Sequence, residues 1–251
     1  MAIIDVRHLV KRYGPLTAVN DISFDVQEGE IFCIVGPNGA GKTTTLEIIE
    51  TLKQPTSGTV YIDGINALHD HWRVKQIIGV QLQAAGFYPG LTLRELLHLF
   101  AGLYDVKIDA RAMLRRVQLE DKAGARFDKL SGGQKQRFSI ISTLVNRPRL
   151  IFLDEPSTGL DPQARRNLWD LVREIRQDGV SIVLTTHYME EAEVLSDRVA
   201  IMDEGRIIAS GTAGELIDQL LARGFVRPQV VRAASLEDVF LDLTGKELRD
   251  E

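Results

Sequence analysis

A glycine-rich loop, Gly36-Pro37-Asn38-Gly39-Ala40-Gly41-Lys42-Thr43, separates an apolar run from a stretch with helical spacing. The run before it, residues 30–35, predicts a buried strand, and residues 42–53 predict a helix. A strand, a loop with this sequence pattern and a helix, in this order, are typical of a phosphate-binding loop. The glycines let backbone N–H groups point inward at phosphate oxygens, and the helix presents its positive dipole end to the same anion. This stretch therefore predicts a nucleotide site in an α/β fold.

The residues of this loop have separate expected roles. We expect the ammonium group of Lys42 to neutralise the β- and γ-phosphates, and the hydroxyl of Thr43 to bind Mg²⁺. Residues 36–43 and the following Thr44 are all predicted to contact the nucleotide. Taken alone, the loop indicates only a nucleoside triphosphate, because kinases, GTPases and motor proteins also carry it.

The sequence on either side of the loop predicts two kinds of sheet. Residues 3–10 and 18–26 are β-like runs with turn residues between them, typical of a small antiparallel sheet. Residues 150–153 and 180–185 are nearly continuous apolar runs, as expected for parallel strands covered on both faces. From about residue 91 to 146, Leu, Phe and Val recur at helical intervals, so this part is predicted to be mostly helical.

The composition argues against several classes of protein. The chain has 251 residues, 44% of them apolar, which supports a large buried core. Its formal net charge is -5 and its 30 basic residues are dispersed, so nucleic acid is not an expected partner. The single cysteine, Cys33, lies in an apolar run and is interpreted as a core residue. No run resembles a signal peptide or reaches the ~18 apolar residues of a membrane-spanning helix, so we expect the chain in the cytosol.

A second candidate anion site occurs much later in the chain, at Leu130-Ser131-Gly132-Gly133-Gln134-Lys135-Gln136-Arg137. A serine and two glycines at the start of a predicted helix offer a hydroxyl and exposed N–H groups to an anion. The same residues could also be an ordinary helix N-cap. Since one nucleotide does not need two phosphate cradles in one chain, we predict that Ser131, Gly132, Gly133 and Gln134 contact the nucleotide of a second copy. That arrangement implies a head-to-tail dimer with the nucleotide at its interface.

This second motif resembles the signature sequence of ABC ATPases, which other families with a phosphate-binding loop lack. A third motif agrees with it: Leu150-Ile151-Phe152-Leu153-Asp154-Glu155 ends a predicted strand in two carboxylates. Asp154 resembles the Walker B aspartate, which holds Mg²⁺ through its water shell. Glu155 matches the family's general base, which orients and deprotonates the attacking water. Alternatively, such a pair of carboxylates could be turn residues that contact only solvent.

Further residues match motifs of the same family. Asp161, in Ser157-Thr158-Gly159-Leu160-Asp161, resembles the D-loop aspartate and would contact the partner's nucleotide. His187 matches the switch histidine at the γ-phosphate, although it could be only a polar residue that ends a strand. Gln83 resembles the Q-loop glutamine, with expected catalytic and metal-binding roles, and Gln81 is a weaker candidate. Tyr13 lies in a stretch like the adenine-stacking loop, with plain packing as the alternative.

The resemblance covers nearly the whole chain and implies a P-loop NTPase fold of the ABC type. The expected parts are a RecA-like core with a parallel sheet, an N-terminal antiparallel β-subdomain and an inserted α-helical subdomain at about residues 88–147. We expect the ATPase domain to span residues 1–225 and a short C-terminal extension to span residues 226–251. One departure from the family pattern is Thr51, where a glycine is usual; we expect it late in the helix, with little catalytic consequence.

Within the family, the stretches after Asp161, around His187 and at residues 235–240 look like those of bacterial ABC-2 type exporters, which export drugs, lipids or polysaccharides. The resemblance implies ATP and Mg²⁺ as cofactors, separate integral-membrane permease subunits as partners, and a homodimer or pseudo-homodimer of ATPase subunits. It places the chain on the inner face of the plasma membrane. The alternatives are the ATPase subunit of an importer and a soluble ABC ATPase that acts on a macromolecule.

Overall fold

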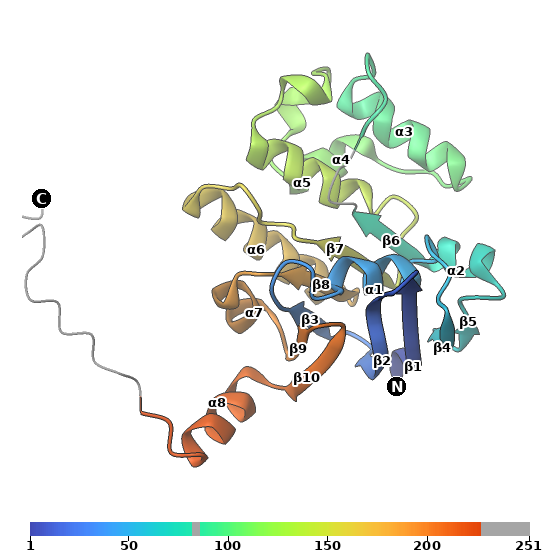
Figure 1. The fold of residues 1–251 in the computed structure, drawn as a ribbon. Coiled ribbons are helices and arrows are strands. Elements are labelled where there is room, and N and C mark those ends of the chain that lie inside the picture. Colours follow the sequence, from blue (N-terminus) through green and yellow to red (C-terminus); the bar gives the residue numbers. More distant parts are fainter. Residues whose placement is uncertain (82–85, 227–251) are drawn as a thin grey trace, which may run out of the picture. The chain divides into compact units, whose positions relative to one another are not determined.

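The computed structural model describes residues 1–81 and 86–226 (Figure 1). The chain divides into two units, Met1–Leu216 and Ile217–Glu251. The first unit contains the sheets described below, and the boundary between the units falls within helix α8 (Ala213–Ala222). No helix of the described residues is both long enough and apolar enough to cross a bilayer.

A six-stranded sheet forms the centre of the first unit, with the strand order β10-β9-β3-β8-β7-β6. Its inner strands pair in parallel, and β10 pairs antiparallel with β9. Every residue of β3, β7 and β8 is buried, which explains their continuous apolar sequences, because helices or a second sheet cover both faces. The bounds of the strands are β3 (Ile31–Val35), β6 (Ile78–Gln81), β7 (Leu150–Asp154), β8 (Ser181–Thr186), β9 (Arg198–Asp203) and β10 (Arg206–Gly211).

Alternate side chains of these strands enter two different cores. Cys33 on β3 faces the core shared with helices α6 (Pro162–Gln177) and α7 (Met189–Leu195). Its neighbour Phe32 faces the core shared with helix α1 (Lys42–Ile49) and the smaller sheet. This period of two fixes which residues of the central strands contact α6 and α7. Cys33 is buried, as predicted, and burial raises the pKa of its thiol well above the usual range.

The smaller sheet is antiparallel, with the order β2-β1-β4-β5. The first two strands were predicted, although they extend further than the apolar runs indicated. The central strand β4 was not anticipated. The bounds are β1 (Ala2–Tyr13), β2 (Leu16–Gln27), β4 (Ser57–Ile62) and β5 (Ile65–Asn66). Helix α2 (His71–Ile77) then leads into β6.

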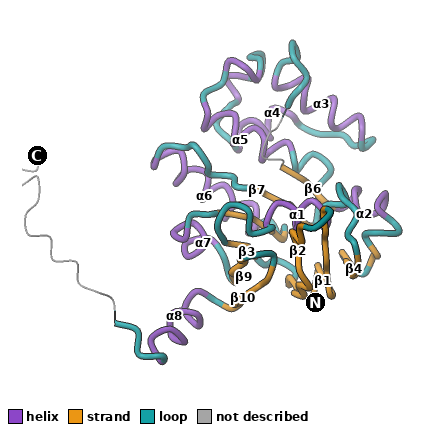
Figure 2. The backbone as a smooth tube through the Cα atoms, viewed as in Figure 1, coloured by secondary structure: helices purple, strands orange, loops and turns teal. Residues whose placement is uncertain are grey.

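Residues 86–149, which lead into β7, are mostly helical, as predicted, and Figure 2 shows them as helices and connecting loops. Thr92 and Glu95 form a reciprocal capping box that starts the first of these helices. The elements are α3 (Leu93–Leu103), α4 (Ala110–Arg116), α5 (Gly132–Ser142) and the short 3₁₀ helices η1 (Glu120–Lys122) and η2 (Phe127–Lys129). The α/β fold with a parallel core, an antiparallel N-terminal sheet and a helical insertion is therefore confirmed.

The helix after the glycine-rich loop is shorter than predicted. Helix α1 ends at Ile49, and Thr51 lies beyond it with a left-handed φ of +64°. Glycine adopts this conformation without steric cost, whereas a β-branched residue is strained there. The expectation that Thr51 lies within the helix was wrong, and its backbone conformation explains why a glycine is usual at this position.

Candidate nucleotide site

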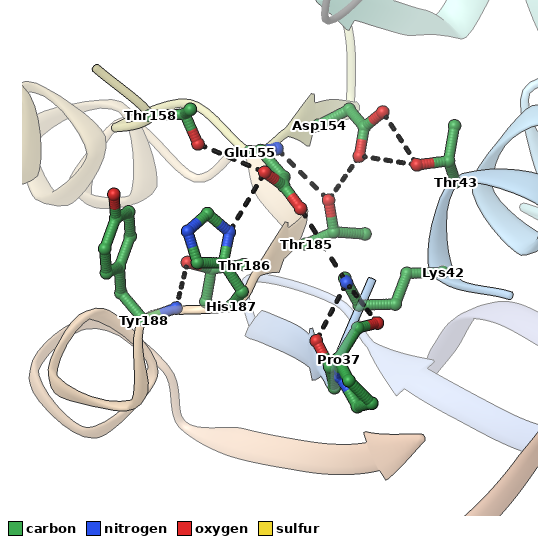
Figure 3. A network of polar contacts seen from close by, with 11 residues as sticks. Pro37, Lys42, Thr43, Asp154, Glu155, Thr158, Thr185, Thr186, His187 and Tyr188 are labelled. Carbon is green, nitrogen blue, oxygen red and sulfur yellow. Dashed lines mark hydrogen bonds and ion pairs between the residues drawn. The ribbon is translucent and has the colours of Figure 1, made fainter. Parts of the chain in front are cut away.

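The glycine-rich loop, Asp154, Glu155 and His187 lie at the carboxyl ends of three neighbouring strands. In the sheet, β8 lies between β3 and β7, so the residues that follow these strands meet at one edge. The glycine-rich loop follows β3, Asp154 ends β7, and His187 follows β8. Ligands of open parallel sheets bind at this edge. Figure 3 shows Lys42, Asp154, Glu155 and His187 gathered there.

The glycines of the loop are required by its backbone. Gly39 and Gly41 have φ values of +84° and +101°, in the region that favours glycine. A Cβ atom on Gly36 would lie 2.1 Å from the carbonyl oxygen of Met202, and one on Gly41 would lie 2.3 Å from that of Ala18. A side chain at Gly36 or Gly41 would therefore push the loop away from the strands that support it.

Lys42 closes the loop from inside. Its side chain is only 5% exposed, and its Nζ atom donates hydrogen bonds to the carbonyl oxygens of Gly36 (2.8 Å) and Pro37 (3.1 Å). The same atom lies 3.7 Å from Oε1 of Glu155. This buried ammonium group thus holds the curled loop and faces the carboxylate of Glu155.

Thr43 and Asp154 bring two oxygen donors together. The Thr43 hydroxyl donates to Oδ2 of Asp154 at 3.2 Å, across the gap between α1 and β7. The hydroxyl of Thr185, on β8, donates to the other carboxylate oxygen of Asp154. Sequence reasoning missed Thr185; a hydroxyl at the end of a strand that neighbours the Asp154 strand is the signal that could have found it.

Glu155 has an unusual backbone and several polar partners. Its φ is +48°, a left-handed value that is uncommon for residues other than glycine and recurs at functional sites. Its N–H donates to the carbonyl and hydroxyl oxygens of Thr185, both at 3.1 Å. Oε2 accepts a hydrogen bond from the Thr158 hydroxyl (3.1 Å) and lies 3.0 Å from Nδ1 of His187 (Figure 3). Thr158 is a second residue that sequence reasoning did not single out.

Tyr13 shares a pocket with the loop. The pocket has a volume of about 370 Å³ and is lined by Tyr13, Leu16, Ala18, Asn38, Gly39, Gly41, Lys42, Thr43, Thr44 and Glu155. Tyr13 lies at the end of β1 and is 41% exposed, so part of this residue is accessible beside the loop. The ammonium groups of Lys11 and Lys53 lie 5.0 Å and 5.8 Å from the ring centre. Gly36 and Ala40 are buried and Pro37 is exposed, and these three loop residues do not line the pocket.

The second predicted anion site is not part of this pocket. Ser131 caps α5 through a reciprocal pair with Gln134: Ser131 N–H donates to Gln134 Oε1 (3.0 Å), and Gln134 N–H donates to Ser131 Oγ (3.4 Å). Ser131 and Gly132 are exposed, and Gly133 is partly exposed. Asp161 caps α6 by accepting a hydrogen bond from Ala164 N–H at 2.8 Å. Among the described residues, neither motif lines the pocket of Lys42.

Of the two candidate Q-loop glutamines, the structure describes only one. Gln83 lies outside the described residues. Gln81, the weaker candidate, ends β6 and is 4% exposed, and its register partner on β7 is Leu153, the residue before Asp154. The strand therefore brings the chain to the edge at which Asp154 lies.

One buried carboxyl near the site was not predicted. Glu50 follows α1 and is 2% exposed. Burial raises its pKa to about 8, and the negative charges of Asp154 and Glu47 add to this shift. Glu50 is therefore mostly protonated at neutral pH and adds little charge beside Asp154.

The chain is similar to proteins of one family in sequence and in structure. The family model described as ABC transporter matches residues 19–158. The Nod factor export ATP-binding protein I of Burkholderia lata is 36% identical over 302 aligned positions, which cover 100% of this chain and 99% of that protein. The protein of that name from Cupriavidus pinatubonensis is 34% identical over 99% of this chain and 93% of its own length.

Two solved structures of ATP-binding proteins are also similar to this chain. The ATP-binding subunit of an ABC transporter matches with a TM-score of 0.79 and 30% identity, over 96% of this chain and 99% of that one. The dimeric post-hydrolysis state of the ATP-binding cassette MJ0796, bound to ADP and Pi, matches with a TM-score of 0.75 and 29% identity, over 83% of this chain and 98% of that one. The family model and the relatives together show that the chain belongs to the ABC transporter family, as an ATP-binding and ATP-hydrolysing cassette.

Proposed function

We propose that this chain is the ATPase subunit of a membrane exporter whose membrane-spanning part is a separate polypeptide. Support comes from relatives that are named as export ATP-binding proteins and that align with this chain from end to end. Such a subunit would lie on the cytoplasmic side of the plasma membrane and bind there to its permease partner. We propose domain limits of residues 1–225 for the ATPase domain and 226–251 for the extension.

A single geometric observation supports the catalytic assignment. Glu155 lies 3.7 Å from Lys42 and 3.0 Å from His187, and it lines the same pocket as the glycine-rich loop. In the proposed reaction Glu155 accepts the proton of the attacking water, and His187 and Lys42 contact the γ-phosphate. The Lys42 ammonium group donates to the carbonyl oxygens of Gly36 and Pro37, which holds it at the loop where the phosphates would bind.

The residues beside the loop suit Mg²⁺. This ion prefers hard oxygen ligands and keeps several of its waters, and Thr43 and Asp154 supply a hydroxyl and a carboxylate whose oxygens lie 3.2 Å apart. When bound, Mg²⁺ would neutralise the charge that develops on the phosphates. Thr185 holds the Asp154 carboxylate toward Thr43 (Figure 3). We assign Thr43 and Asp154 to the metal, and Gln83 as a further ligand from the sequence pattern alone.

We further propose that two copies bind two ATP molecules between them. Ser131, Gly132, Gly133 and Gln134 would contact the γ-phosphate of the nucleotide held by the Lys42 loop of the other copy, and Asp161 would face the same interface. The α5 N-terminus is exposed and does not line the chain's own pocket, which supports this assignment. The γ-phosphate would favour the closed dimer because it makes these contacts only when the dimer is closed.

Co-purification from membranes tests the transport proposal. The tagged full chain would be isolated from detergent-solubilised native membranes, with the Lys42→Ala variant as a control for nucleotide-dependent contacts. We expect a polytopic membrane protein to co-purify and to raise the ATPase rate when the two are reconstituted. Recovery of soluble macromolecules alone would refute the exporter assignment and leave the ATPase chemistry intact.

A further inference from the structure

Three contacts, regularly spaced along both helices, connect α6 to α7. The guanidinium of Arg165 lies 4.5 Å from the ring centre of Tyr188. Nε1 of Trp169 donates a hydrogen bond to Oε1 of Glu191 at 3.0 Å, and Nη2 of Arg173 donates to the carbonyl oxygen of Val194 at 3.4 Å. The three α6 residues are spaced by four and their partners by three, so each set follows one face of its helix. We call these three pairs the α6–α7 ladder.

The ladder matters for α7 because this helix has little stability of its own. It has only 7 residues, and its N-cap residue, Tyr188, makes no side-chain capping bond. Helices this short are marginal in water, so tertiary contacts must fix the position of α7. Burial of Ala192 and Leu195 stabilises α7 but does not fix its orientation. The ladder contacts can fix it, because they depend on the direction of the interacting groups.

Trp169 and Glu191 form the central contact of the ladder. The Glu191 side chain is 0% exposed, and among the described residues the Trp169 N–H is the hydrogen-bond donor to its carboxyl group. A buried carboxyl that loses its donor is costly, and the structure around it must move to compensate. Removal of this N–H should therefore displace the first turn of α7.

The segments that precede the two helices both contact Glu155. His187 directly precedes Tyr188, their ring centres lie 4.1 Å apart, and Nδ1 of His187 lies 3.0 Å from Glu155. Helix α6 begins after Asp161, and the loop before it carries Thr158, whose hydroxyl donates to the same Glu155 oxygen. Displacement of the start of α7 relative to α6 would therefore move the His187 ring relative to Glu155.

We propose that Arg165, Trp169 and Glu191 are positioning residues for His187, which fix its ring at the γ-phosphate by holding the first turn of α7 against α6. This inference rests on the proposed role of His187 and names the residues that set its place. It also links the start of α6, where Asp161 would face the partner copy, to the histidine of the same chain.

Steady-state ATPase kinetics of the full chain test the proposal. For Arg165→Met and Trp169→Phe we expect kcat to fall about 10- to 100-fold, since small misplacements of a catalytic group cost this much. KM for ATP should change little, because the Lys42 loop is not altered. Glu191→Gln, which retains an oxygen acceptor for Trp169, should keep more activity than Glu191→Ala. Arg166→Met, at an exposed neighbouring position on α6, is the matched control and should retain the normal rate.

Double variants separate positioning from general destabilisation. When Arg165→Met is added to His187→Ala, kcat should fall no further, because the positioned group is absent. A full additional loss would overturn the proposal, as would normal kcat in both Arg165→Met and Trp169→Phe. Normal activity of His187→Ala would refute the proposed role of His187 and this inference with it. If kcat fell in His187→Ala but stayed normal in the ladder variants, only the positioning role of the ladder would be refuted.

Fluorescence gives an independent readout. The chain has two tryptophans, and Trp72 is 69% exposed on α2, so Trp72→Phe leaves Trp169 as the reporter. We expect a non-hydrolysable ATP analogue to change Trp169 emission more than ADP does, because only the former presents a γ-phosphate to His187. His187→Ala should remove this difference. Identical spectra with both nucleotides, or a difference that survives His187→Ala, would overturn the proposal.

Discussion

Nδ1 of His187 lies 3.0 Å from Oε2 of Glu155, although the two residues are 32 positions apart in the chain. The contact exists because β7 and β8 are neighbours in the parallel sheet and both end at the same edge. Thr185 strengthens this arrangement, since it pairs with Asp154 in register and accepts the N–H of Glu155. The contact joins the proposed general base to the proposed γ-phosphate sensor in one chain.

Replacement of Glu155 tests the general base. Glu155→Gln keeps the shape of the side chain but cannot accept a proton, so hydrolysis should slow by roughly 10²- to 10⁴-fold while ATP binding persists. Phosphate release measures the first effect and calorimetry measures the second. Glu190→Gln, at an exposed position on α7, should behave like the unaltered protein. Near-normal turnover of Glu155→Gln would remove Glu155 from this role.

Replacement of Asp154 tests the metal assignment. Asp154→Asn removes the charge that would hold the hydrated ion, so the Mg²⁺ concentration for half-maximal ATPase activity should rise about 10- to 100-fold. The measurement is a Mg²⁺ titration at saturating ATP. Asp170→Asn, at an exposed position on α6, is the control. An unchanged Mg²⁺ requirement would show that Asp154 does not serve the metal.

Two substitutions of Tyr13 test base stacking. Tyr13→Ala should weaken ATP binding about 3- to 10-fold, the usual worth of an aromatic contact, whereas Tyr13→Phe should bind nearly normally because the ring remains. Calorimetric titration with ATP compares the two. If Phe and Ala weaken binding equally, the hydroxyl rather than the ring face matters, and the stacking interpretation fails.

Glu50 predicts a pH dependence of stability. The folded protein raises the pKa of this carboxyl from 4.5 to about 8, so below pH 4.5 both the folded and unfolded states bind its proton. As the pH rises toward 8, the unfolded state releases that proton first and the folded state loses relative stability. Glu50→Gln should therefore raise the free energy of unfolding by up to about 4 kcal/mol more at pH 8 than at pH 5.

Urea denaturation at the two pH values measures this difference. Glu47→Gln is the comparison: Glu47 is partly buried on α1 and forms an ion pair with Lys53, and loss of its charge, which adds to the Glu50 shift, should change the pH dependence much less than Glu50→Gln does. An equal effect of Glu50→Gln at both pH values would contradict the raised pKa.

The sequence by itself determined the local chemistry of this protein. The glycine-rich loop, its strand and its helix are contiguous, so Lys42 and Thr43 could be assigned from spacing alone. The paired carboxylates Asp154 and Glu155 could be placed at the end of a strand because a continuous apolar run precedes them. The helices between β6 and β7 were predicted from about residue 91 to 146, since Leu, Phe and Val recur there with the helical period.

Only the tertiary structure decided which of these motifs meet. The order β3-β8-β7, which places His187 beside Glu155, depends on strand pairing between distant segments and on the packing of α6 and α7. The roles of Thr185 and Thr158, and the separation of Ser131 from the chain's own pocket, depend on the same arrangement. A local sequence pattern shows whether a segment forms a helix or a strand, but it does not show which other segments pack against it. Packing partners depend on the burial of apolar surfaces that lie far apart in the chain.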